Sequence, residues 1–335
     1  YPELAATEAR MKASYERIKA KRSLAWRLAY AAASKSKTLI VVDVTDVDNL
    51  DVVGSVEGDR IESTFGLCLS PNGTDVFVVA NDYLSVVDVR DPTNPIVTGV
   101  VGDNWLSLAR ECVVAADGHT LFVSGYWYDA LLVVDVSNTS NPVIVHYMYD
   151  GVALNGAYGL ALSPDKTLLY VTCFEGNALT VVNVTDPLSP WVVASYVDKE
   201  NLNSPSDIVL SHNGQYAFVT ARFSKSLTVF DVGSNRTGTP TFVSRLVNTT
   251  YLGSAMIVKL SPDGNIVFVG GEYDITNVAM VNVTNVKSLE MLAYTDQLDG
   301  VRGMAVAPDG RTLFAVGVMP KFSFAAVDLW TCKGE

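Results

Sequence analysis

The chain has 335 residues, of which nearly half are apolar and few are charged, so it can bury a large core and does not have the composition of a disordered protein. No apolar run reaches the roughly 18 residues that a membrane-spanning helix needs. The net charge of −12 argues against a nucleic-acid partner, because phosphate neutralisation requires a basic surface.

The N-terminal segment differs from the rest of the chain in charge and composition. Residues 1–37 carry nine Lys/Arg and three acidic residues, a net of +6, whereas the remainder carries −18. Ala, Glu, Lys and Arg dominate residues 1–26, and the apolar residues there follow helical spacing. We predict an α-helical arm over residues 1–23 that can extend to residue 34. Its predicted interface residues are Leu4, Met11, Tyr15, Ile18, Arg22 and Trp26.

Two short phrases recur at a steady interval after this arm. The first reads VVDV at 41–44, 86–89 and 133–136, and four later variants follow, so that successive copies lie 45 to 51 residues apart. The second, of the type LSPDG, separates two short apolar runs in each of six copies. In one repeat the expected strands are 158–163, 168–173, 178–184 and 191–197. Four short strands in about 45 residues are typical of a β-propeller blade.

An acid or amide ends the third strand of every repeat. These residues are Asp43, Asp88, Asp135, Asn183, Asp231, Asn282 and Asp328. Turn sequences follow them, and Asp or Asn at such a position can accept backbone N–H bonds from the turn. Because each residue lies on its own blade, we do not expect the seven to bind one metal ion.

The repeats predict an all-β propeller over residues 24–335. Residues 28–33 align with a second strand, so we favour seven blades with a degenerate first one, and six blades is the alternative. The closing repeat has strands at 302–307, 312–317 and 324–329 and no fourth strand after them. It must borrow an outer strand from the N-terminus, stay three-stranded, or take a strand from another chain.

These phrases resemble two related families of repeat propellers. LIVVDVTD and LLVVDVSNTSNP resemble the LVIVD repeat, and GLALSPDKTLLYVTCFEGNALTVVNV resembles the YVTN repeat shared with phosphogluconolactonase-like lactonases. The resemblance covers about residues 28–330. It implies the propeller fold, and a secreted or cell-surface repeat protein more often than an enzyme, because propellers carry many unrelated activities.

Catalytic signatures are hard to find in the sequence. The three histidines have no Cys or carboxylate at metal-binding spacing, and no P-loop, G-x-S-x-G, H-E-x-x-H or dinucleotide motif occurs. We therefore predict no catalytic residues, no metal site and no cofactor. The best remaining candidate is a small-ligand site at the mouth of the central channel, where innermost strands begin. Its residues would be Glu62, Arg110, Glu111, Asp207 and Arg302.

The four cysteines allow three full pairings. Cys68 and Cys112 lie in first strands of consecutive blades, offset by one residue, so they would lie on opposite faces that confront each other. A disulfide between them and buried free thiols are both open at this point. Cys332 in the tail could cross-link or stay free.

Six N-x-S/T sequons occur, where chance would give about three. Two of these asparagines, Asn183 and Asn282, end third strands, so they could serve as hydrogen-bond acceptors in the following turn instead of carrying a glycan. The six are Asn72, Asn138, Asn235, Asn248, Asn183 and Asn282. We expect N-linked glycans on a secreted, extracellular or cell-surface protein.

These observations predict a non-enzymatic structural glycoprotein, a self-assembling subunit of an extracellular filament, coat or surface appendage. The arm or the incomplete closing blade would contact a neighbouring copy head-to-tail or another surface protein. The arm could instead cap its own propeller, and contact with a membrane surface is a less favoured role. The first alternative is a monomeric surface propeller that binds a protein or glycan. The second is a lactonase-like hydrolase that uses the channel mouth.

Overall fold

A computed structural model of the chain describes most of the repeat region and not the arm. The described residues are 27–33, 37–233, 238–271, 278–295, 300–317, 323–328 and 333–334. The predicted helical arm and its interface residues lie outside them, as do Asn235 and Cys332. In the described part, no helix is long and apolar enough to cross a bilayer.

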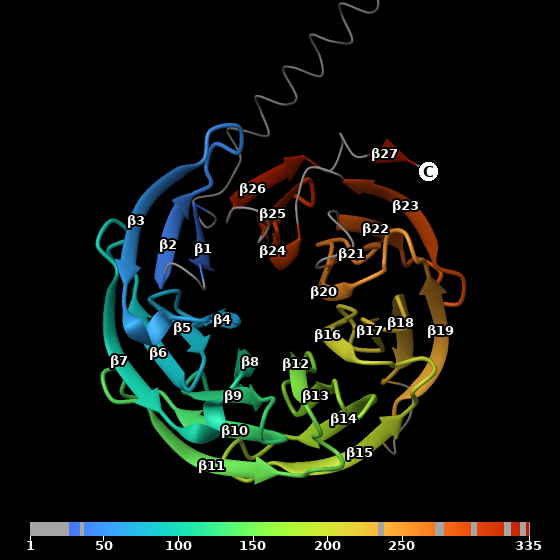
Figure 1. The fold of residues 1–335 in the computed structure, drawn as a ribbon, viewed down its shortest axis with the longest axis horizontal. Helices are drawn as coiled ribbons and strands as arrows, with labels where there is room; N and C mark the ends of the chain where they lie inside the picture. Colours follow the sequence, from blue (N-terminus) through green and yellow to red (C-terminus); the bar gives the residue numbers. More distant parts are fainter. Residues whose placement is uncertain are drawn as a thin grey trace, which may run out of the picture.

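Seven antiparallel sheets surround one axis (Figure 1), so the protein is an all-β seven-bladed propeller, and the alternative of six blades is wrong. Blade one contains β1 (Leu28–Ala33), β2 (Thr38–Asp43) and β3 (Asp51–Glu57). Blade two contains β4 (Gly66–Leu69), β5 (Asp75–Ala80), β6 (Tyr83–Asp88) and β7 (Ile96–Gly102). Blade three contains β8 (Ala109–Val114), β9 (Thr120–Gly125), β10 (Ala130–Asp135) and β11 (Val143–Tyr149).

The next three blades repeat this order from the axis outward. Blade four contains β12 (Ala157–Leu162), β13 (Leu168–Cys173), β14 (Ala178–Asn183) and β15 (Trp191–Val197). Blade five contains β16 (Pro205–Leu210), β17 (Tyr216–Ala221), β18 (Ser226–Asp231) and β19 (Thr241–Val247). Blade six contains β20 (Ala255–Leu260), β21 (Ile266–Gly271), β22 (Val278–Asn282), β23 (Glu290–Thr295) and β27 (Lys333–Gly334).

Blade seven contains β24 (Val301–Val306), β25 (Thr312–Gly317) and β26 (Ser323–Asp328), and in the described residues it has three strands. The C-terminal strand β27 pairs with β23 of blade six instead of completing blade seven. The expectation that residues 28–33 form a strand is confirmed, because β1 pairs with β2 along its whole length. Blades one and seven meet through apolar side chains, among them Val42 and Val44 on one side and Ala307 and Phe314 on the other.

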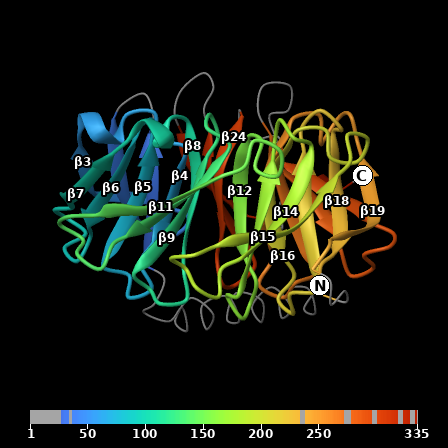
Figure 2. The same ribbon diagram turned by 90° about the horizontal axis from the view of Figure 1, so that it is seen from below.

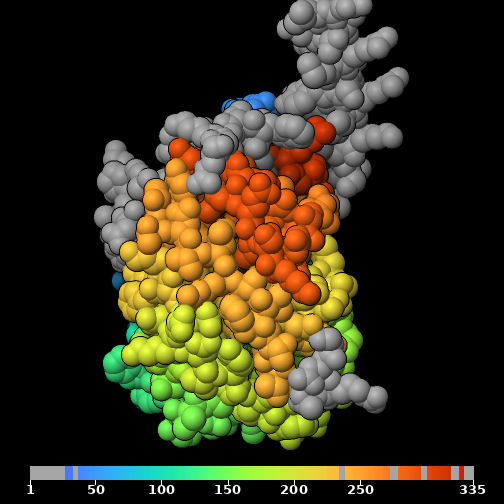
Figure 3. Space-filling view, turned by 90° about the vertical axis from the view of Figure 1, so that its right-hand side faces the viewer, coloured from blue at the N-terminus to red at the C-terminus, as the bar shows by residue number. Residues whose placement is uncertain are grey.

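The blades have buried central strands and half-exposed outer strands. Every residue of β9 is buried, whereas β11 alternates exposed and half-buried residues, as expected for a strand with one face in solvent. Seen from below, β12 and β14 stand close to the axis direction while β11 and β15 are strongly tilted, which is the twist of each blade (Figure 2). In the side view the residues of blades five and six form one continuous outer surface (Figure 3). Two short 3-10 helices, η1 (Asp59–Ile61) and η2 (Asn104–Leu106), follow the outer strands of blades one and two.

The strand-end acids and amides have the turn role that their position predicts. A side-chain oxygen of the residue accepts a hydrogen bond from the backbone N–H two residues later, at distances of 2.8–3.2 Å. The prediction is confirmed at Asp43, Asp88, Asp135, Asn183, Asp231 and Asn282. The turn after Asp328 lies outside the described residues.

Buried hydroxyl groups join neighbouring blades near the axis. The register shifts at the start of innermost strands β8, β12 and β16, so an extra residue bulges there. The backbone N–H of Gly159 in one such bulge donates to Thr172 Oγ1 at 2.8 Å. The Thr172 hydroxyl donates in turn to the carbonyl of Ser206 in the next blade at 3.0 Å. Ser124 bridges blades three and four in the same way, through the carbonyl of Tyr158.

We expect Thr172→Val to destabilise the fold. Valine has the same shape but no hydroxyl, so the N–H of Gly159 and the carbonyl of Ser206 would each lose a buried partner, at about 1–3 kcal/mol per group. Urea denaturation should show this loss in the free energy of unfolding. Thr93→Val is the matched control, because the exposed Thr93 hydroxyl bonds only to a carboxylate in its own turn. Equal stability of the two variants would contradict the bridging role.

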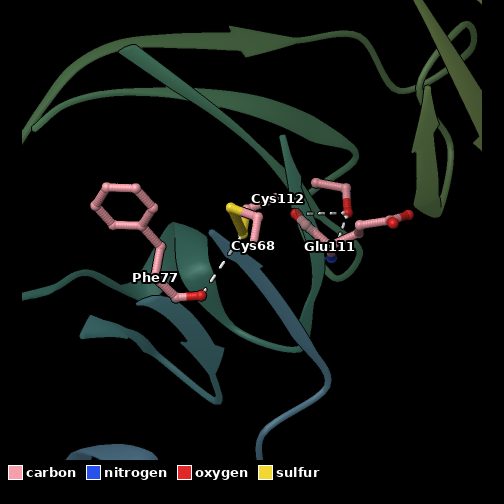
Figure 4. The surroundings of a disulfide bond; sticks show 5 residues. Cys68, Phe77, Glu111 and Cys112 are labelled. Atoms are coloured by element: carbon pink, nitrogen blue, oxygen red, sulfur yellow. Dashed lines mark hydrogen bonds between the residues drawn. A yellow bond between two sulfur atoms is a disulfide. The ribbon is translucent and has the colours of Figure 1, made fainter. Parts of the chain in front are cut away.

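A disulfide joins the innermost strands of blades two and three. Cys68 on β4 and Cys112 on β8 are bonded, with their Cα atoms 5.9 Å apart (Figure 4). Cys112 directly follows Glu111, whose backbone N–H donates to Ser124 Oγ at 3.0 Å. Cys173 is a buried free thiol, and burial raises its pKa to about 12. The disulfide therefore holds the strand that presents Arg110 and Glu111 to the axis.

Candidate active site at the propeller axis

Three arginines from three non-adjacent blades converge on one tyrosine. Arg110 lies at the start of β8, Arg222 follows the end of β17, and Arg302 lies at the start of β24. Strands β16 and β17 are antiparallel, so the end of β17 lies at the same face of the ring as the starts of the innermost strands. The charges of all three arginines act on the hydroxyl of Tyr158 and favour its ionised form, although burial raises the pKa of Tyr158 overall. We call these four residues the arginine cluster.

The electrostatics of this cluster favour an anionic ligand. Burial lowers the pKa of Arg302, and repulsion from Arg110 and Arg222 lowers it further. The nearby phenol of Tyr158 acts in the opposite direction. Like charges held together in a partly buried site are stabilised when a negative group lies among them.

Arg110 is held by aromatic rings and has a buried donor. Its guanidinium lies 4.1 Å from the ring centre of Phe65, 4.9 Å from that of Tyr126 and 5.0 Å from that of Tyr158. Among the described residues, Arg110 Nε is the buried side-chain donor that has no hydrogen-bond partner. A buried N–H without a partner is costly, so the atom is suited to receive a hydrogen bond acceptor from a ligand.

A tyrosine–glutamate pair lies beside Arg110. The hydroxyl of Tyr126, which directly follows β9, donates to Glu175 Oε1 at 2.5 Å. Burial and the Glu175 carboxylate raise the pKa of Tyr126 to about 12. Glu175 follows β13 in the next blade, so the pair also connects blades three and four at this face of the ring.

A second charged group lies deeper along the axis. Glu111 on β8 accepts a hydrogen bond from the N–H of Leu160 at 2.8 Å, and Asp207 on β16 accepts one from the N–H of Val258 at 2.8 Å. Lys259 Nζ lies 3.4 Å from Asp207 Oδ2. Each carboxylate thus bridges its own blade to the next and faces the ammonium group of Lys259.

The pKa values of this group depend on burial and on mutual charge. Burial raises the pKa of Glu111 to about 8, and the Asp207 carboxylate adds to the increase while Lys259 and the N–H of Leu160 oppose it. Burial alone would lower the pKa of Lys259, but the Asp207 and Glu111 carboxylates raise it overall. The Lys259 side chain still has an exposed fraction of 33 %, so the group keeps an open face.

That open face is a pocket of about 400 Å³ on the axis. Glu111 and Lys259 supply its charged groups, and apolar residues of β8, β12 and β16 supply most of its wall. The pocket opens toward the turns at Pro164 and His212, which is the face of the ring opposite to the arginine cluster. The arginine cluster and this axial pocket are therefore two layers at the axis, and the adjacent residues Arg110 and Glu111 belong one to each.

The structure brings four of the five predicted channel-mouth residues together. Arg110 and Arg302 belong to the arginine cluster, and Glu111 and Asp207 lie in the deeper layer. Glu62 has a different position, because its carboxylate pairs with Lys37 at 3.0 Å beside blade one. Sequence reasoning missed Arg222, Tyr126, Tyr158, Glu175 and Lys259.

Two signals in the sequence could have found the missed residues. Within a blade, the residue that follows the second strand lies at the same face of the ring as the start of the innermost strand. This position places Tyr126, after β9, and Arg222, after β17, near the axis. Lys259 is the one charged residue in the apolar run SAMIVKLS. In the described part of the chain, no group of three or more His, Cys, Asp or Glu side chains is arranged to hold a metal ion.

Comparison with protein families identifies the chain. A model described as the lactonase, seven-bladed β-propeller family matches residues 111–288, which is more than half of the chain. The chain belongs to this lactonase family. The LVIVD repeat model matches residues 74–103 of this lactonase-family propeller, so the resemblances to the LVIVD repeat and to lactonase-like propellers are confirmed. A comparison with curated proteins finds none that matches it.

Solved structures share the fold of this lactonase-family chain at low sequence identity. A 6-phosphogluconolactonase candidate from Bacteroides fragilis is 11% identical, with a TM-score of 0.77 and coverage of 94% of this chain and 97% of that one. The periplasmic gluconolactonase of Pseudomonas aeruginosa is 15% identical, with a TM-score of 0.73 and coverage of 91% and 96%. Hydrazine synthase of Kuenenia stuttgartiensis is 22% identical, with a TM-score of 0.61 and coverage of 78% and 75%.

Membership of the lactonase family contradicts the prediction that the protein is not an enzyme. The physical reason is that the charged residues occupy unequal positions in their repeats. Arg110 and Arg302 lie in first strands, whereas Arg222 follows a second strand, so a search for one repeated position does not group them. Closure of the ring brings them together.

Proposed function

We propose that the protein hydrolyses the lactone of an anionic sugar acid at the propeller axis. The observation that carries this proposal is the convergence of three arginines on Tyr158, with Arg110 Nε buried and without a partner in the described structure. Family membership supports it, as do two structural neighbours, one a candidate 6-phosphogluconolactonase and the other a periplasmic gluconolactonase. The arginines provide the cationic surroundings that an acidic substrate and a developing oxyanion require.

Each step of lactone hydrolysis has a residue in this site. Arg222 and Arg302 hold the acidic substituent of the substrate, and Arg110 donates to the lactone carbonyl oxygen. Glu111, the neighbour of Arg110 on β8, takes a proton from water as the water oxygen attacks the carbonyl carbon. The tetrahedral intermediate then collapses, the ring C–O bond breaks, and Glu111 returns its proton to the departing alkoxide. The product is the open hydroxy acid.

The direct test is an assay of purified protein with a panel of lactones. The panel contains a phosphorylated sugar lactone, a carboxylated sugar lactone and a neutral lactone of the same ring size. We expect turnover of the acidic lactones above the uncatalysed rate and little turnover of the neutral one, because only the acidic lactones engage Arg222 and Arg302. No turnover of any lactone would overturn the proposal.

The pH dependence of the reaction should report the ionisation of Glu111. Its pKa is raised to about 8, so the base is protonated below that pH and kcat/KM should rise with pH and level off above about 8. Rates must be corrected for hydroxide-catalysed hydrolysis at each pH. Glu111→Gln keeps an acceptor for the N–H of Leu160 and should lose this pH-dependent rise together with most of the activity. A Glu111→Gln profile that matches the wild type would assign the base elsewhere.

Secretion, glycosylation and contacts with other copies remain predictions. All five described sequon asparagines accept hydrogen bonds from their own turns, but Asn72 and Asn138 are exposed whereas Asn183, Asn248 and Asn282 are half-buried. Glycopeptide mass spectrometry of the native protein should therefore find glycans first at Asn72 and Asn138. Deletion of residues 1–23 followed by light scattering tests the proposed role of the arm in assembly.

A further inference from the structure

Exposed aromatic residues gather on blade three. The side chains of Trp127 and Tyr149 are 65 % and 63 % exposed, and Tyr128 and Tyr147 are also exposed. Trp105 contacts the three tyrosines, with ring-centre distances of 5.1 Å to Tyr128, 5.6 Å to Tyr147 and 6.1 Å to Tyr149. Trp127 directly precedes Tyr128 in the turn after β9. We call these five residues the aromatic platform. Rings of this size usually gain stability by burial, so their exposure together indicates a binding surface.

The platform begins beside the arginine cluster. Tyr126 contacts Arg110 at the axis, and Trp127 and Tyr128 follow it directly in the turn between β9 and β10. Two residues of chain span at most about 7 Å, so the first platform residues lie close to the axial site. Tyr147 and Tyr149 lie on the outermost strand β11, which places the other end of the platform at the outer edge of the ring (Figure 1).

Carboxylates border the rings and fix their positions. Asp103 Oδ2 accepts a hydrogen bond from the hydroxyl of Tyr147 at 2.9 Å, and Asp103 Oδ1 accepts one from the N–H of Trp105 at 2.9 Å. Asp129 accepts from the N–H of Gly156 at 2.7 Å, and Asp150 from the N–H of Val152 at 3.0 Å. The loops that carry the platform are thus tied by side-chain bonds, which reduces the entropy lost when a ligand binds.

The charge of blade three is opposite to that of the arginine cluster. The sequence contains no Lys or Arg between Glu111 and Asp165, and the residues next to the platform are Asp103, Asp129 and Asp150. An anionic group would therefore avoid the platform and enter the arginine cluster. The part of a ligand that lies on the platform cannot be anionic, and it needs an apolar face for the rings and hydrogen-bond donors for the carboxylates, which a sugar ring provides.

We propose that the aromatic platform binds a neutral pyranose residue, and that the substrate is an anionic sugar lactone extended by at least one such residue. A pyranose ring has an axial C–H face that packs on Trp and Tyr rings, and its equatorial hydroxyls can donate to Asp103 and Asp129. The extension of the substrate rests on the lactone hydrolysis proposed above, whereas saccharide binding by the platform does not depend on it.

The test measures binding of neutral disaccharides and trisaccharides of gluco, galacto and xylo configuration, followed by tryptophan fluorescence and saturation-transfer NMR. We expect at least one of them to bind, and Trp127→Ala and Tyr149→Ala each to weaken its binding by about tenfold, the equivalent of one lost ring contact. Trp191→Ala is the matched control, because Trp191 is 55 % exposed on the outer strand of blade four, away from the platform, and its removal should change nothing.

The outcomes separate this proposal from the lactonase activity. Arg110→Met should leave saccharide binding intact even where lactone turnover is lost. Failure of every saccharide to bind, or equal binding by wild type, Trp127→Ala and Tyr149→Ala, would overturn the proposal that the platform binds saccharides. Neither result would affect the proposal of lactone hydrolysis, which the lactone assay tests separately. Binding of tetramethylammonium in place of sugars, or loss of self-association in Trp127→Ala, would overturn it in favour of a cation site or an interface between copies.

Discussion

Replacement of Arg110 by methionine should lower kcat/KM for an acidic lactone by about 10²–10³-fold, the usual effect of removing one oxyanion donor. Methionine keeps the apolar contact with Phe65 and Tyr158 but removes the buried Nε donor and one of three converging charges. Steady-state kinetics on the purified variant measures the change. Most of the loss should appear in kcat, because the donor acts on charge that develops in the transition state.

The control for this variant is Arg245→Met. Arg245 lies on β19 at the outer edge of blade five and pairs with Glu200, so its removal deletes a charge of the same type away from the axis. Its kcat/KM should stay within about twofold of wild type. Equal losses of kcat/KM in the two variants would show a general effect of charge. A kcat/KM of Arg110→Met close to that of the wild type would exclude Arg110 from the reaction.

The arginine cluster also predicts how its members combine. Arg110, Arg222 and Arg302 act on the same phenol and repel one another, so each removal changes the surroundings of the other two. Their effects on kcat/KM should therefore not add. The three arginines do not line the axial pocket, whose wall consists mostly of residues of β8, β12 and β16. We therefore expect the arginine variants to fold as the wild type does.

The blade is the part of this protein that its sequence predicts well. The alternation of apolar and polar residues, the Pro-Asp-Gly turns and the strand-end acids are all local signals, and each has a local physical cause. The strands expected at 168–173 and 191–197 match β13 and β15. The degenerate first blade was also predictable, because residues 28–33 keep the spacing of a second strand.

The axial site is harder to predict because it depends on closure of the ring. Arg110, Arg222 and Arg302 are separated by about two blades each in the sequence, and the ring geometry alone brings them to one phenol. Glu111 and Asp207 were found because they start innermost strands, but a strand start has an ordinary structural role as well. Their bonds to Leu160 and Val258 in the next blade show this structural role, beside which the proposed role in the reaction would stand.

The aromatic platform was also outside the reach of periodicity. Tyr147 and Tyr149 occupy exposed positions of a strand whose alternation is regular, so the pattern gives no sign of function there. Trp127 and Tyr128 lie in a turn, and Trp105 lies in a 3-10 helix of another segment. Only the fold places these three segments together.

Removal of the disulfide should produce a large loss of stability. The bond closes a loop with a sequence separation of 44 residues, for which chain entropy gives about 4 kcal/mol. The double variant Cys68→Ser/Cys112→Ser should lose about this amount from the free energy of unfolding in urea, and oxidised wild type should lose it on treatment with a thiol reductant. The reductant should have no further effect on the double variant.

The same change should reach the proposed active site through β8. Cys112 anchors the strand that carries Arg110 and Glu111, and Cys112 packs in the apolar cluster between blades two and three. Loosening of this strand should lower kcat/KM of the double variant at temperatures well below its unfolding midpoint. A double variant whose free energy of unfolding lies within about 1 kcal/mol of oxidised wild type would show that packing between blades two and three, and not the disulfide, holds β8 in place.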